Sequence, residues 1–457
     1  MFGKPYLRIL IVLACGLTLL MALASASALG SLPAWGVVTS PNQGSRDNAL
    51  YGIAAVSSND IWVVGDWNPN VPPTETGRRT LAQHWDGVNW QIVTTPDPSW
   101  SGMDYATLQD VAAVATNDVW AMGYSEDFAS LKSETLIQHW DGTAWTIVAS
   151  PNPGGSNLIN KLRAVAAVGP SDVWAVGGGG YPERAMILHW DGVSWSAVNN
   201  RCRVPLYGVT VVSATDIWAV GDNTTCRYNG VSWQRVNSPQ PRPAYSEVSY
   251  SLRDVDAVAT NDMWAAGSRV LDYGKYLVNL SFFEHWNGSN WTRTLGAPGQ
   301  IMYGVAAVST NDVWAVGTSG FGPLILHWDG VTWDSVPTPS EGSGGSLQAI
   351  DALAADELWA AGYYYDDTFD EQTLIEQAPS TTSGNVVGDT NVAGAVVTWI
   401  GLESGSATTD AFGEYEAAGL LAGAYTFIAS YGGCTPDSAT VVVTVGLTIN
   451  QDFQLDC

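Results

Sequence analysis

The chain alternates short apolar runs with polar turns, and this alternation repeats along most of its length. In residues 311–339 (NDVWAVGTSGFGPLILHWDGVTWDSVPTP) a turn leads into an apolar run with a Trp, and a variable loop leads into a second run ending in His-Trp. A tight Asp-Gly turn and a closing apolar run complete the unit. Each run has about four to seven residues, which suits a strand and is too short for a helix.

The unit occurs seven times, and its first Trp marks each copy. These residues are Trp62, Trp120, Trp174, Trp218, Trp264, Trp314 and Trp359. Repeats of roughly 40–50 residues with four short strands are typical of β-propellers, in which each repeat forms one blade. Strands covered on both faces are near-continuous apolar runs, and wedges between blades need large flat side chains. All but Trp67, Trp100 and Trp399 of the 22 tryptophans fall at three positions of the unit.

The seventh unit is incomplete, because no Asp-Gly turn and no closing Trp follow Trp359. The missing strand is found near the other end of the chain, where WGVVTSP (residues 35–41) matches WQIVTTP (residues 90–96) of the first full unit. Closing the ring in this way removes open sheet edges. We therefore predict an all-β chain with a seven-bladed β-propeller over residues 35–378, closed by the N-terminal strand.

A second domain follows the propeller. The Trp pattern stops at PSTTSG (residues 379–384), which we expect to be a linker. Residues 385–457 predict a small β-sandwich, with strands at Val386 and in four further segments, and with a turn-rich section at residues 409–415. The four segments are residues 396–400, 425–430, 440–445 and 448–453.

The N-terminus has the features of an export signal. Lys4 and Arg8 precede an apolar stretch at residues 9–23, and Ala-Ser-Ala at residues 26–28 fits a cleavage site, so residues 1–28 predict a signal peptide. Processing at Cys15 as a lipoprotein, or retention as an uncleaved anchor, remain alternatives. No second apolar span follows, and we expect a secreted or cell-surface protein without a membrane span in the mature chain.

Charge narrows the range of partners. The formal net charge is -26, and no Lys or Arg follows Arg293. Such a chain repels a phosphate backbone, so we expect no nucleic-acid partner. The acidity itself indicates solubility first, with cation binding or salt tolerance as alternatives.

Four cysteines remain beyond the predicted signal peptide. Cys202 and Cys226 lie in one repeat, and Cys434 and Cys457 lie in the C-terminal segment. Export permits disulfides, and the even split suggests two local bridges, with free buried thiols as the alternative. Four cysteines allow three pairings, among which the sequence does not choose.

Two family resemblances follow from these motifs. The repeat, with HWDGVTW at residues 327–333, resembles bacterial kelch- and Asp-box-type propeller repeats, although its Asp-to-Trp spacing is one residue shorter than the usual Asp box. That resemblance implies a structural role for the hairpin. The C-terminal segment resembles a carboxypeptidase regulatory-like (transthyretin-like, Cna-B-related) domain, through VAGAVV at residues 392–397, TDAFGEY at 409–415 and GLLAGAYT at 419–426. The segment has no Lys, which excludes the Lys–Asn cross-link of some Cna-B relatives.

The repeated polar residues favour structural roles. All five histidines (His84, His139, His189, His285 and His327) occupy one repeat position, where the fourth copy has Arg227 and the seventh has Glu376. Equivalent positions are spread around a ring and cannot converge on a metal, so we expect each His to bond a turn of its own blade and predict no metal site. The Asp residues before the Trp strand and in the Asp-Gly turns fit the same role.

Function is expected where the copies differ. Loops between second and third strands, and connections between blades, share one face, and exposed aromatics on loops of a rigid scaffold are typical of binding surfaces. The candidate ligand-binding residues on this face are Trp67, Trp100, Tyr105, Tyr124, Tyr245, Tyr250, Tyr273, Tyr276, Tyr363, Tyr364, Tyr365 and Asp366. Innermost strands add channel candidates, namely Asp110, Asp254, Asp256, Asp351, Arg163 and Arg253.

We therefore predict an exported, monomeric, non-catalytic binding or adhesion protein that presents this face to an extracellular glycan or protein. No catalytic residues and no cofactor are predicted, although a structural cation in the channel is an alternative. A glycan-active, sialidase-like propeller enzyme and a purely structural surface protein are alternative functions. The Arg residues show no triad of the kind that sialidase-like chemistry needs.

Overall fold

The computed structural model describes residues 35–69, 77–98, 104–127, 132–155, 158–239, 246–274, 276–320, 322–339, 341–355, 357–378, 383–401, 404–421, 423–443 and 448–457. The predicted signal peptide lies outside these residues. The part described is built of strands and turns, as the alternation of short apolar runs predicts. Within it, no helix is long and apolar enough to cross a membrane.

Seven four-stranded antiparallel sheets follow one another and are called blades 1 to 7. Blade 1 contains β2 (Asn48–Ser57), β3 (Asp60–Trp67), β4 (Arg79–Trp85) and β5 (Trp90–Ile92). Blade 2 contains β6 (Asp104–Ala115), β7 (Asp118–Asp127), β8 (Lys132–Trp140) and β9 (Trp145–Ile147). Blade 3 contains β10 (Asn160–Gly169), β11 (Asp172–Gly179), β12 (Arg184–Trp190) and β13 (Trp195–Ala197).

The later blades repeat this order. Blade 4 contains β14 (Leu206–Ser213), β15 (Asp216–Gly221), β16 (Thr224–Tyr228) and β17 (Trp233–Val236). Blade 5 contains β18 (Ser246–Ala259), β19 (Asp262–Asp272), β20 (Leu277–Trp286) and β21 (Trp291–Pro298). Blade 6 contains β22 (Gln300–Ser309), β23 (Asp312–Ser319), β24 (Gly322–Trp328) and β25 (Trp333–Val336).

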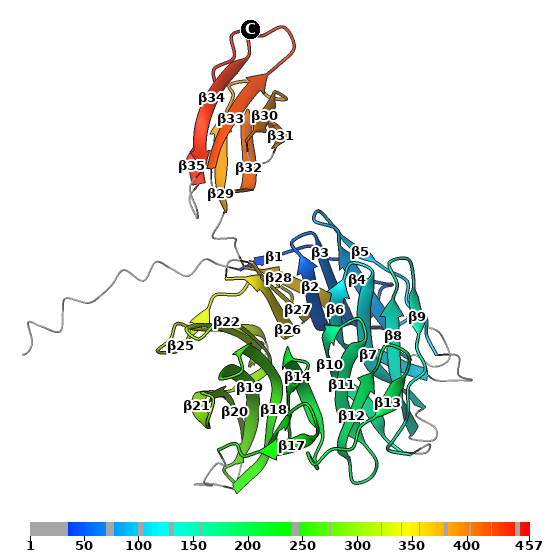
Figure 1. Cartoon of the computed structure of the whole chain (residues 1–457). Helices are drawn as coiled ribbons and strands as arrows, with labels where there is room; N and C mark the ends of the chain where they lie inside the picture. The colour runs from blue at the N-terminus through cyan, green and yellow to red at the C-terminus, as the bar shows by residue number, and fades with distance from the viewer. Residues whose placement is uncertain are drawn as a thin grey trace, which may run out of the picture.

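Blade 7 joins the two ends of the propeller. It contains β26 (Gly345–Ala354), β27 (Glu357–Tyr365), β28 (Glu371–Gln377) and, as its outer strand, β1 (Gly36–Val37). Gly36 pairs with Gln377 and Val37 with Glu376, which confirms the predicted closure by the N-terminal strand. Innermost strands of consecutive blades contact one another, and β26 contacts β2, so the blades surround a common axis (Figure 1). The fold is therefore a β-propeller, as predicted.

Tryptophans form the contacts between blades. Each second-strand Trp packs against aromatic rings of the next blade: Trp62 of blade 1 lies 5.0 Å from Trp140 and 5.3 Å, edge-on, from Trp145 of blade 2, measured between ring centroids. The same arrangement closes the ring, where Trp359 of blade 7 contacts Trp85 and Trp90 of blade 1. These indoles are buried, and each can remove roughly 150–250 Å² from water.

Each histidine joins the Trp strand to its own turn. His84 Nε2 lies 2.8 Å from Asp60 Oδ1, and its ring stacks on Trp62 at 4.4 Å. The other four histidines make the same Asp contact, so the predicted structural role is confirmed. In blade 4, Arg227 replaces His and donates two hydrogen bonds to Asp216.

Blade 7 requires a correction. The residue paired with Trp359 is Gln377, so the assignment of Glu376 to the His position was wrong by one residue. The third strand of blade 7 lacks the His-Trp end that fixes the alignment elsewhere. Glu376 instead occupies the position of Gln83 and Gln138, whose amides donate to the carbonyls of Pro41 and Pro96 of the preceding blade.

The C-terminal segment forms two small sheets. One contains β32 (Glu414–Leu421), β29 (Ser383–Asp389) and β35 (Thr448–Asn450); the other contains β31 (Ser404–Thr408), β30 (Val396–Ile400), β33 (Gly423–Ser430) and β34 (Asp437–Val443). Val397, Tyr415 and Phe427 lie in their shared core. This is the predicted β-sandwich, although the sequence predicted neither β31 nor β32, and the last two residues of the predicted turn-rich section (409–415) are the first two of β32.

Both local disulfides are present. Cys202 is bonded to Cys226 in blade 4, and Cys434 to Cys457 in the C-terminal domain. The pairing that the sequence left open is thus the one within each region. In a small domain with a limited core, such a bridge contributes stability by restricting the unfolded chain.

Replacing Trp35 should open the ring at its closure. Trp35 is buried in the core between blades 6 and 7, and its ring centroid lies 5.7 Å from that of Trp314. We expect Trp35→Ala to lower the free energy of unfolding by about 3–5 kcal/mol, the range for a large buried aromatic. Denaturant unfolding measures this. Val37→Ala, at a position 38% exposed in the same segment, is the control, and an equal loss in both variants would contradict the role of Trp35.

Glu376 should make stability fall as pH rises. Its carboxyl is fully buried, neither oxygen has a hydrogen-bond partner among the described residues, and burial, with Glu341 nearby, raises its pKa from 4.5 to about 8. Below about pH 4.5 both states are protonated. Between 4.5 and 8 the unfolded chain releases this proton and the folded chain keeps it, so the free energy of unfolding falls.

We expect Glu376→Gln to remove this component, which amounts to about 1 kcal/mol or more between pH 5 and 8. Other buried acids titrate in the same window, so the difference between wild type and variant is the quantity to measure, by denaturant unfolding at each pH. Gln83→Glu should introduce the same decline at the matching position of blade 1. Parallel curves for wild type and Glu376→Gln would refute the assignment.

Candidate binding site at the channel mouth

A ring of seven side chains surrounds one end of the central channel. Each innermost strand has a β-bulge near its start, and the bulged residue lies at the same place in every blade. We call these residues the mouth ring: Tyr51, Gln109, Arg163, Tyr207, Arg253, Tyr303 and Gln348. All seven line one cavity of about 240 Å³. Because the second strands end here, the mouth opens on the face that carries the variable loops.

A glycine in the second strand makes room for each bulge. The residue before Tyr51, Leu50, is paired with Gly65, and a Cβ on Gly65 would lie 1.8 Å from the Ala49 carbonyl oxygen. In the other blades a Cβ on the corresponding glycine would likewise lie too close to a backbone carbonyl oxygen of the innermost strand. These glycines are Gly123, Gly177, Gly221, Gly267, Gly317 and Gly362. A side chain is excluded there, so the repeated Trp-x-x-Gly motif fixes where each innermost strand bulges.

The two arginines of the ring flank a tyrosine. Their guanidinium carbons lie 4.8 Å (Arg163) and 4.6 Å (Arg253) from the centroid of the Tyr207 ring, within cation–π range. The Tyr207 hydroxyl donates to Asp222 at 3.3 Å. Burial raises the pKa of Tyr207, so this phenol remains protonated at neutral pH.

The arginines differ in their ion pairs. Arg163 Nη2 donates to Glu183 Oε1 at 2.7 Å, so its charge is compensated within blade 3. Arg253 makes no ion pair with any residue that the structure describes, and its Nε is buried without a hydrogen-bond partner. One cationic side chain at the mouth therefore lacks a counter-charge from the protein.

Glutamines complete the ring with fixed amides. Gln109 Nε2 donates to Thr107 Oγ1 at 3.0 Å, and Gln348 Nε2 donates to Ser346 Oγ at 2.9 Å. Each amide is thus held by the hydroxyl two residues earlier on its own strand. Its carbonyl oxygen remains an acceptor for a ligand hydroxyl.

Below the mouth, aspartates connect neighbouring blades. Asp110 accepts backbone N–H groups from Val111 of its own strand and Val165 of blade 3, each within 2.9 Å. Asp254, Asp256 and Asp351 make the same double contact to the blade that follows. Burial raises the pKa of Asp110 to about 8, against the effect of these bonds. The channel aspartates therefore hold blades together, and they line a cavity of about 320 Å³.

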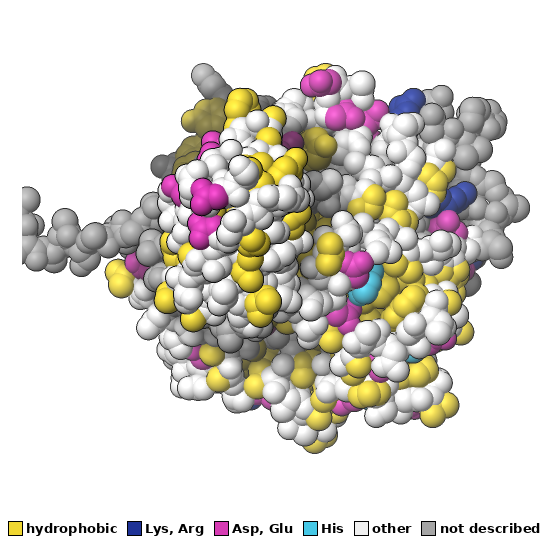
Figure 2. All heavy atoms as spheres, turned by 90° about the horizontal axis from the view of Figure 1, so that it is seen from above, with side chains coloured by type: hydrophobic (Ala, Val, Ile, Leu, Met, Phe, Trp, Pro, Cys, Tyr) yellow, Lys and Arg dark blue, Asp and Glu magenta, His cyan; other side chains and the backbone are white. Residues whose placement is uncertain are grey.

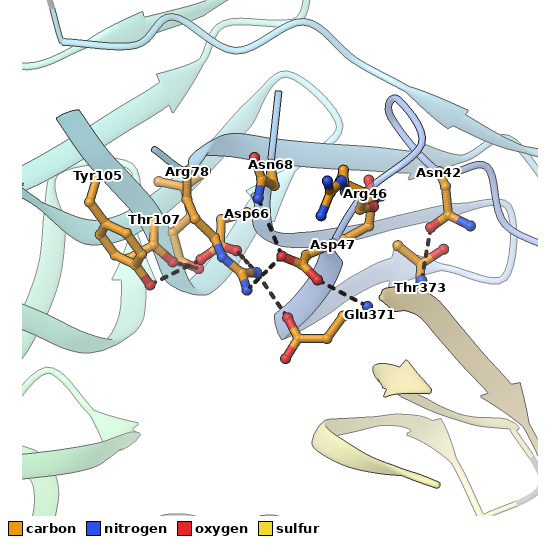
Figure 3. Close-up of polar contacts among 12 residues, drawn as sticks. Asn42, Arg46, Asp47, Asp66, Asn68, Arg78, Tyr105, Thr107, Glu371 and Thr373 are labelled. Atoms are coloured by element: carbon orange, nitrogen blue, oxygen red, sulfur yellow. Dashed lines mark hydrogen bonds and ion pairs between the residues drawn. The ribbon is translucent and has the colours of Figure 1, made fainter. Parts of the chain in front are cut away.

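An arginine cluster lies beside the ring at the closure of the propeller (Figure 3). Arg78 Nη1 contacts Asp66 at 2.8 Å and Glu371 at 2.9 Å, and Nη2 lies 3.4 Å from Asp47. Glu371 belongs to blade 7 and the other residues to blade 1. Burial raises the pKa of Asp66 to about 6, and Arg78 opposes this rise. The Asp66 side chain has no exposed surface, and through Arg78 it is linked to Glu371 of blade 7, so this cluster joins the two ends of the propeller.

Four of the predicted site residues lie near the ring. Tyr105 and Tyr124 stack with centroids 5.9 Å apart, and the Tyr105 hydroxyl donates to Asp66. Tyr363 and Tyr365 lie edge to face at 5.6 Å, and Tyr303 of the ring contributes to the raised pKa of Tyr363, whose main cause is burial. These aromatics lie in strands β6, β7 and β27, which extend into segments predicted as loops.

Other predicted residues lie elsewhere. Tyr250 is buried, stacks on Phe282 and donates to Glu284, and Trp67 packs into the core between blades 7 and 1. Tyr364 packs between blades 6 and 7. The sequence predicted these side chains to be exposed because they lie outside the repeated motif. In the structure the strands continue beyond that motif, and alternate side chains along them are buried. Asp366 accepts backbone N–H groups of its own turn.

Two further aromatics form a separate feature. Tyr273 and Tyr276 are 40% and 63% exposed and stack at 5.5 Å at the tip of the β19–β20 hairpin of blade 5. Trp100 and Tyr245 lie outside the described residues. Within the described ranges, no group of three or more His, Cys, Asp and Glu residues is placed to hold a metal ion.

The sequence contained a signal for the ring that its analysis missed. Of the ring, only Arg163 and Arg253 were named as channel candidates. In every repeat the ring residue follows a buried Leu or Met, precedes Gly, Ala or Asp, and lies eleven residues before the second-strand Trp. Aligning the seven copies at this position would have identified Tyr51, Tyr207 and Tyr303.

Charged side chains on the surface follow the acidic composition of the chain. On the face shown in Figure 2, Lys and Arg side chains are few, and acidic side chains are more numerous. Such a surface disfavours polyanions in general. An arginine without an acidic partner therefore stands apart from its surroundings.

Comparisons with known proteins identify one domain. Residues 381–456 match the family model of the carboxypeptidase regulatory-like domain, which confirms that resemblance for the C-terminal segment. No curated protein matches the chain in sequence.

Solved structures are similar at low identity. YCF48 bound to a D1 peptide is 16% identical with a TM-score of 0.49, covering 78% of this chain and 100% of that one. The extracellular domain of a putative hybrid two-component system from B. thetaiotaomicron is 9% identical with a TM-score of 0.42, covering 92% and 58%. A gluconolactonase from Xanthomonas campestris is 12% identical with a TM-score of 0.35, covering 73% and 86%.

Removing a channel aspartate should weaken the ring of blades. Asp351→Ala leaves the N–H groups of Ala55 and Ala352 without their acceptor, so we expect a loss of about 2–4 kcal/mol in the free energy of unfolding. Asp351→Asn keeps one acceptor oxygen and should lose less. Denaturant unfolding measures both, with exposed Asp367→Ala as control. An unchanged midpoint for Asp351→Ala would show that the contact contributes nothing.

Proposed function

We propose that this protein is a non-catalytic binding protein whose ligand, a glycan, enters the channel mouth from the variable face. The mouth ring carries the proposal. One residue from each blade is directed to a single polar cavity, and the ring combines aromatic, amide and guanidinium groups on a rigid scaffold. Flat rings can stack on the apolar faces of sugars, while amides and phenols bond sugar hydroxyls.

Binding is favoured over hydrolysis by the state of the carboxylates. Glycoside hydrolysis commonly needs two carboxyl groups flanking the bond. Among the described residues near the mouth, Asp110 and Asp254 hold backbone N–H groups, and Glu183 pairs with Arg163. Asp222 accepts from Ser251 and Tyr207. Each is engaged in holding the structure.

A peptide ligand is less favoured by the same site. One common mode of peptide binding adds a strand to an exposed edge of a sheet. Here aspartates bridge the innermost strands of blades 2 and 3, 5 and 6, and 7 and 1. The polar lining also offers few apolar side chains for peptide anchors, since Ala164 and Ala349 are its aliphatic members.

Export and repeat type belong to the same proposal. Two disulfides fit an oxidising, extracellular compartment and support a chain secreted through its N-terminal segment. The Asp-Gly turn supports a kelch- or Asp-box-like repeat, because Asp329 accepts the N–H groups of Val331 and Thr332 at 2.8 Å while Gly330 adopts a positive φ of 93°.

A glycan array with purified protein, followed by titration calorimetry of the hits, tests the proposal. We expect Tyr303→Ala to weaken binding about tenfold or more, because a ring that stacks on the ligand is lost. Tyr276→Ala, at the exposed hairpin tip, and Tyr431→Ala, 46% exposed in the C-terminal domain, should bind as wild type does.

Three results would reject the proposal. The absence of any glycan ligand would favour a structural protein or a protein partner. Loss of binding in Tyr276→Ala or Tyr431→Ala, with Tyr303→Ala unaffected, would move the site elsewhere. Turnover of chromogenic glycosides would make the protein an enzyme.

A further inference from the structure

The unpaired guanidinium of Arg253 points to the chemistry of the ligand. Among the half-buried arginines of the loop face that the structure describes, Arg78 meets three carboxylates and Arg163 meets one, whereas Arg253 and Arg269 make no ion pair. Of these last two, Arg253 lines the mouth cavity and Arg269 does not. Arg293, in the interior of blade 5, is held by Glu284. In a chain of 44 acidic residues and 18 basic ones, an arginine at the mouth of a cavity without a counter-charge is unusual. Burying part of a charge without a partner costs free energy, which a ligand can offset.

The geometry leaves the arginine able to bind. Arg253 contacts Tyr207 through its guanidinium, 4.6 Å from the ring centroid, and stacking of this kind occupies the flat face of the group. The N–H groups lie in the guanidinium plane and are not used in stacking. A planar edge of N–H donors matches the two oxygens of a carboxylate. Arg163 adds an Nη1 that is also buried without a partner.

The surroundings favour one negative charge on the ligand. Asp110 and Asp254 line the same cavity, and Glu183 already balances Arg163. A doubly charged phosphate would have one uncompensated arginine to balance its two charges. A monocarboxylate needs one counter-charge, which is what Arg253 supplies.

The rest of the ring fits a hydroxylated body attached to that carboxylate. Gln109 and Gln348 present carbonyl oxygens whose orientation is fixed by Thr107 and Ser346. Tyr51 and Tyr303 lie in the same lining with partly exposed rings. The cavity of about 240 Å³ is smaller than the roughly 300–1,000 Å³ of typical drug-sized pockets, so it suits one terminal unit of a longer ligand.

We propose that the mouth ring binds an acidic sugar unit of the uronic acid type at the end of a glycan, with Arg253 holding its carboxylate. This inference rests on the proposed function and adds the charge of the ligand to it. Tyr207 and Arg163 act as positioning residues that keep the Arg253 guanidinium at the mouth.

Matched sugar pairs provide the test. Glucuronic acid and glucose, and galacturonic acid and galactose, differ in one carboxylate, and oligosaccharides ending in these units extend each pair. By titration calorimetry we expect the acidic member to bind about tenfold or more tightly. Arg253→Gln should abolish that preference, so that the acidic and the neutral member of each pair bind with equal affinity. Arg184→Gln removes the same charge from an exposed site outside the mouth and should change neither.

Other outcomes separate this inference from the proposed function. Equal affinity for acidic and neutral sugars, lost in Tyr303→Ala, would overturn the inference and leave glycan binding intact. A preference for acidic sugars that persists in Arg253→Gln would overturn the role of Arg253. Tighter binding of glucose 6-sulfate than of glucuronic acid would replace the carboxylate by another anion. Binding of acidic peptides alone would overturn both proposals.

Discussion

Packing of indoles between blades is the interaction on which the rest of the structure depends. Six of the second-strand tryptophans contact third- and fourth-strand aromatics of the following blade, and Trp314 contacts Trp35, so every blade is covered by its neighbour and none has a core of its own. A ring with this construction has no independent part, and its stability depends on closure. This is why blade 7 takes its outer strand from residues before blade 1, and why Trp35 occupies the position of the outer-strand Trp.

The same strand that supplies the Trp also sets the position of the site. Three residues after the Trp, a glycine allows the innermost strand to bulge, and the bulge directs one side chain toward the channel. The residue before the bulge is fully buried, as Leu50 is, and the residue after it is small or bonded to the next blade, as Asp110 is. The bulged side chain faces the channel cavity and not the core between blades, so it can vary between blades without weakening the ring.

Much of the fold follows from the sequence, because its determinants repeat. The Trp, His-Trp and Asp-Gly positions predicted the strands, the closure at residues 35–41 and the structural role of His84 and its counterparts, since seven copies of one pattern average out local ambiguity. The site was harder to predict. Tyr250 and Trp67 lie outside the repeated motif. There the burial of a side chain depends on how far the hairpin extends and on which face of the strand the side chain lies, and the residue types alone do not reveal either. Glu376 was misplaced because its strand lacks the His-Trp end that anchors the other alignments.

The acidic groups of the channel have structural roles, whereas the arginines of the mouth ring are the groups proposed to bind a ligand. The channel aspartates accept N–H groups from two blades each, so they are bound to the framework and their positions are dictated by it. The arginines of the mouth ring lie at β-bulges. The fold fixes the backbone position there but does not require a particular side chain. Among the described residues, a carboxylate balances Arg163 but none balances Arg253, so the mouth has room for the charge of a ligand at this point. An acidic protein can thus recognise an acidic sugar, because over a few ångströms a single guanidinium outweighs the screened charge of the distant surface.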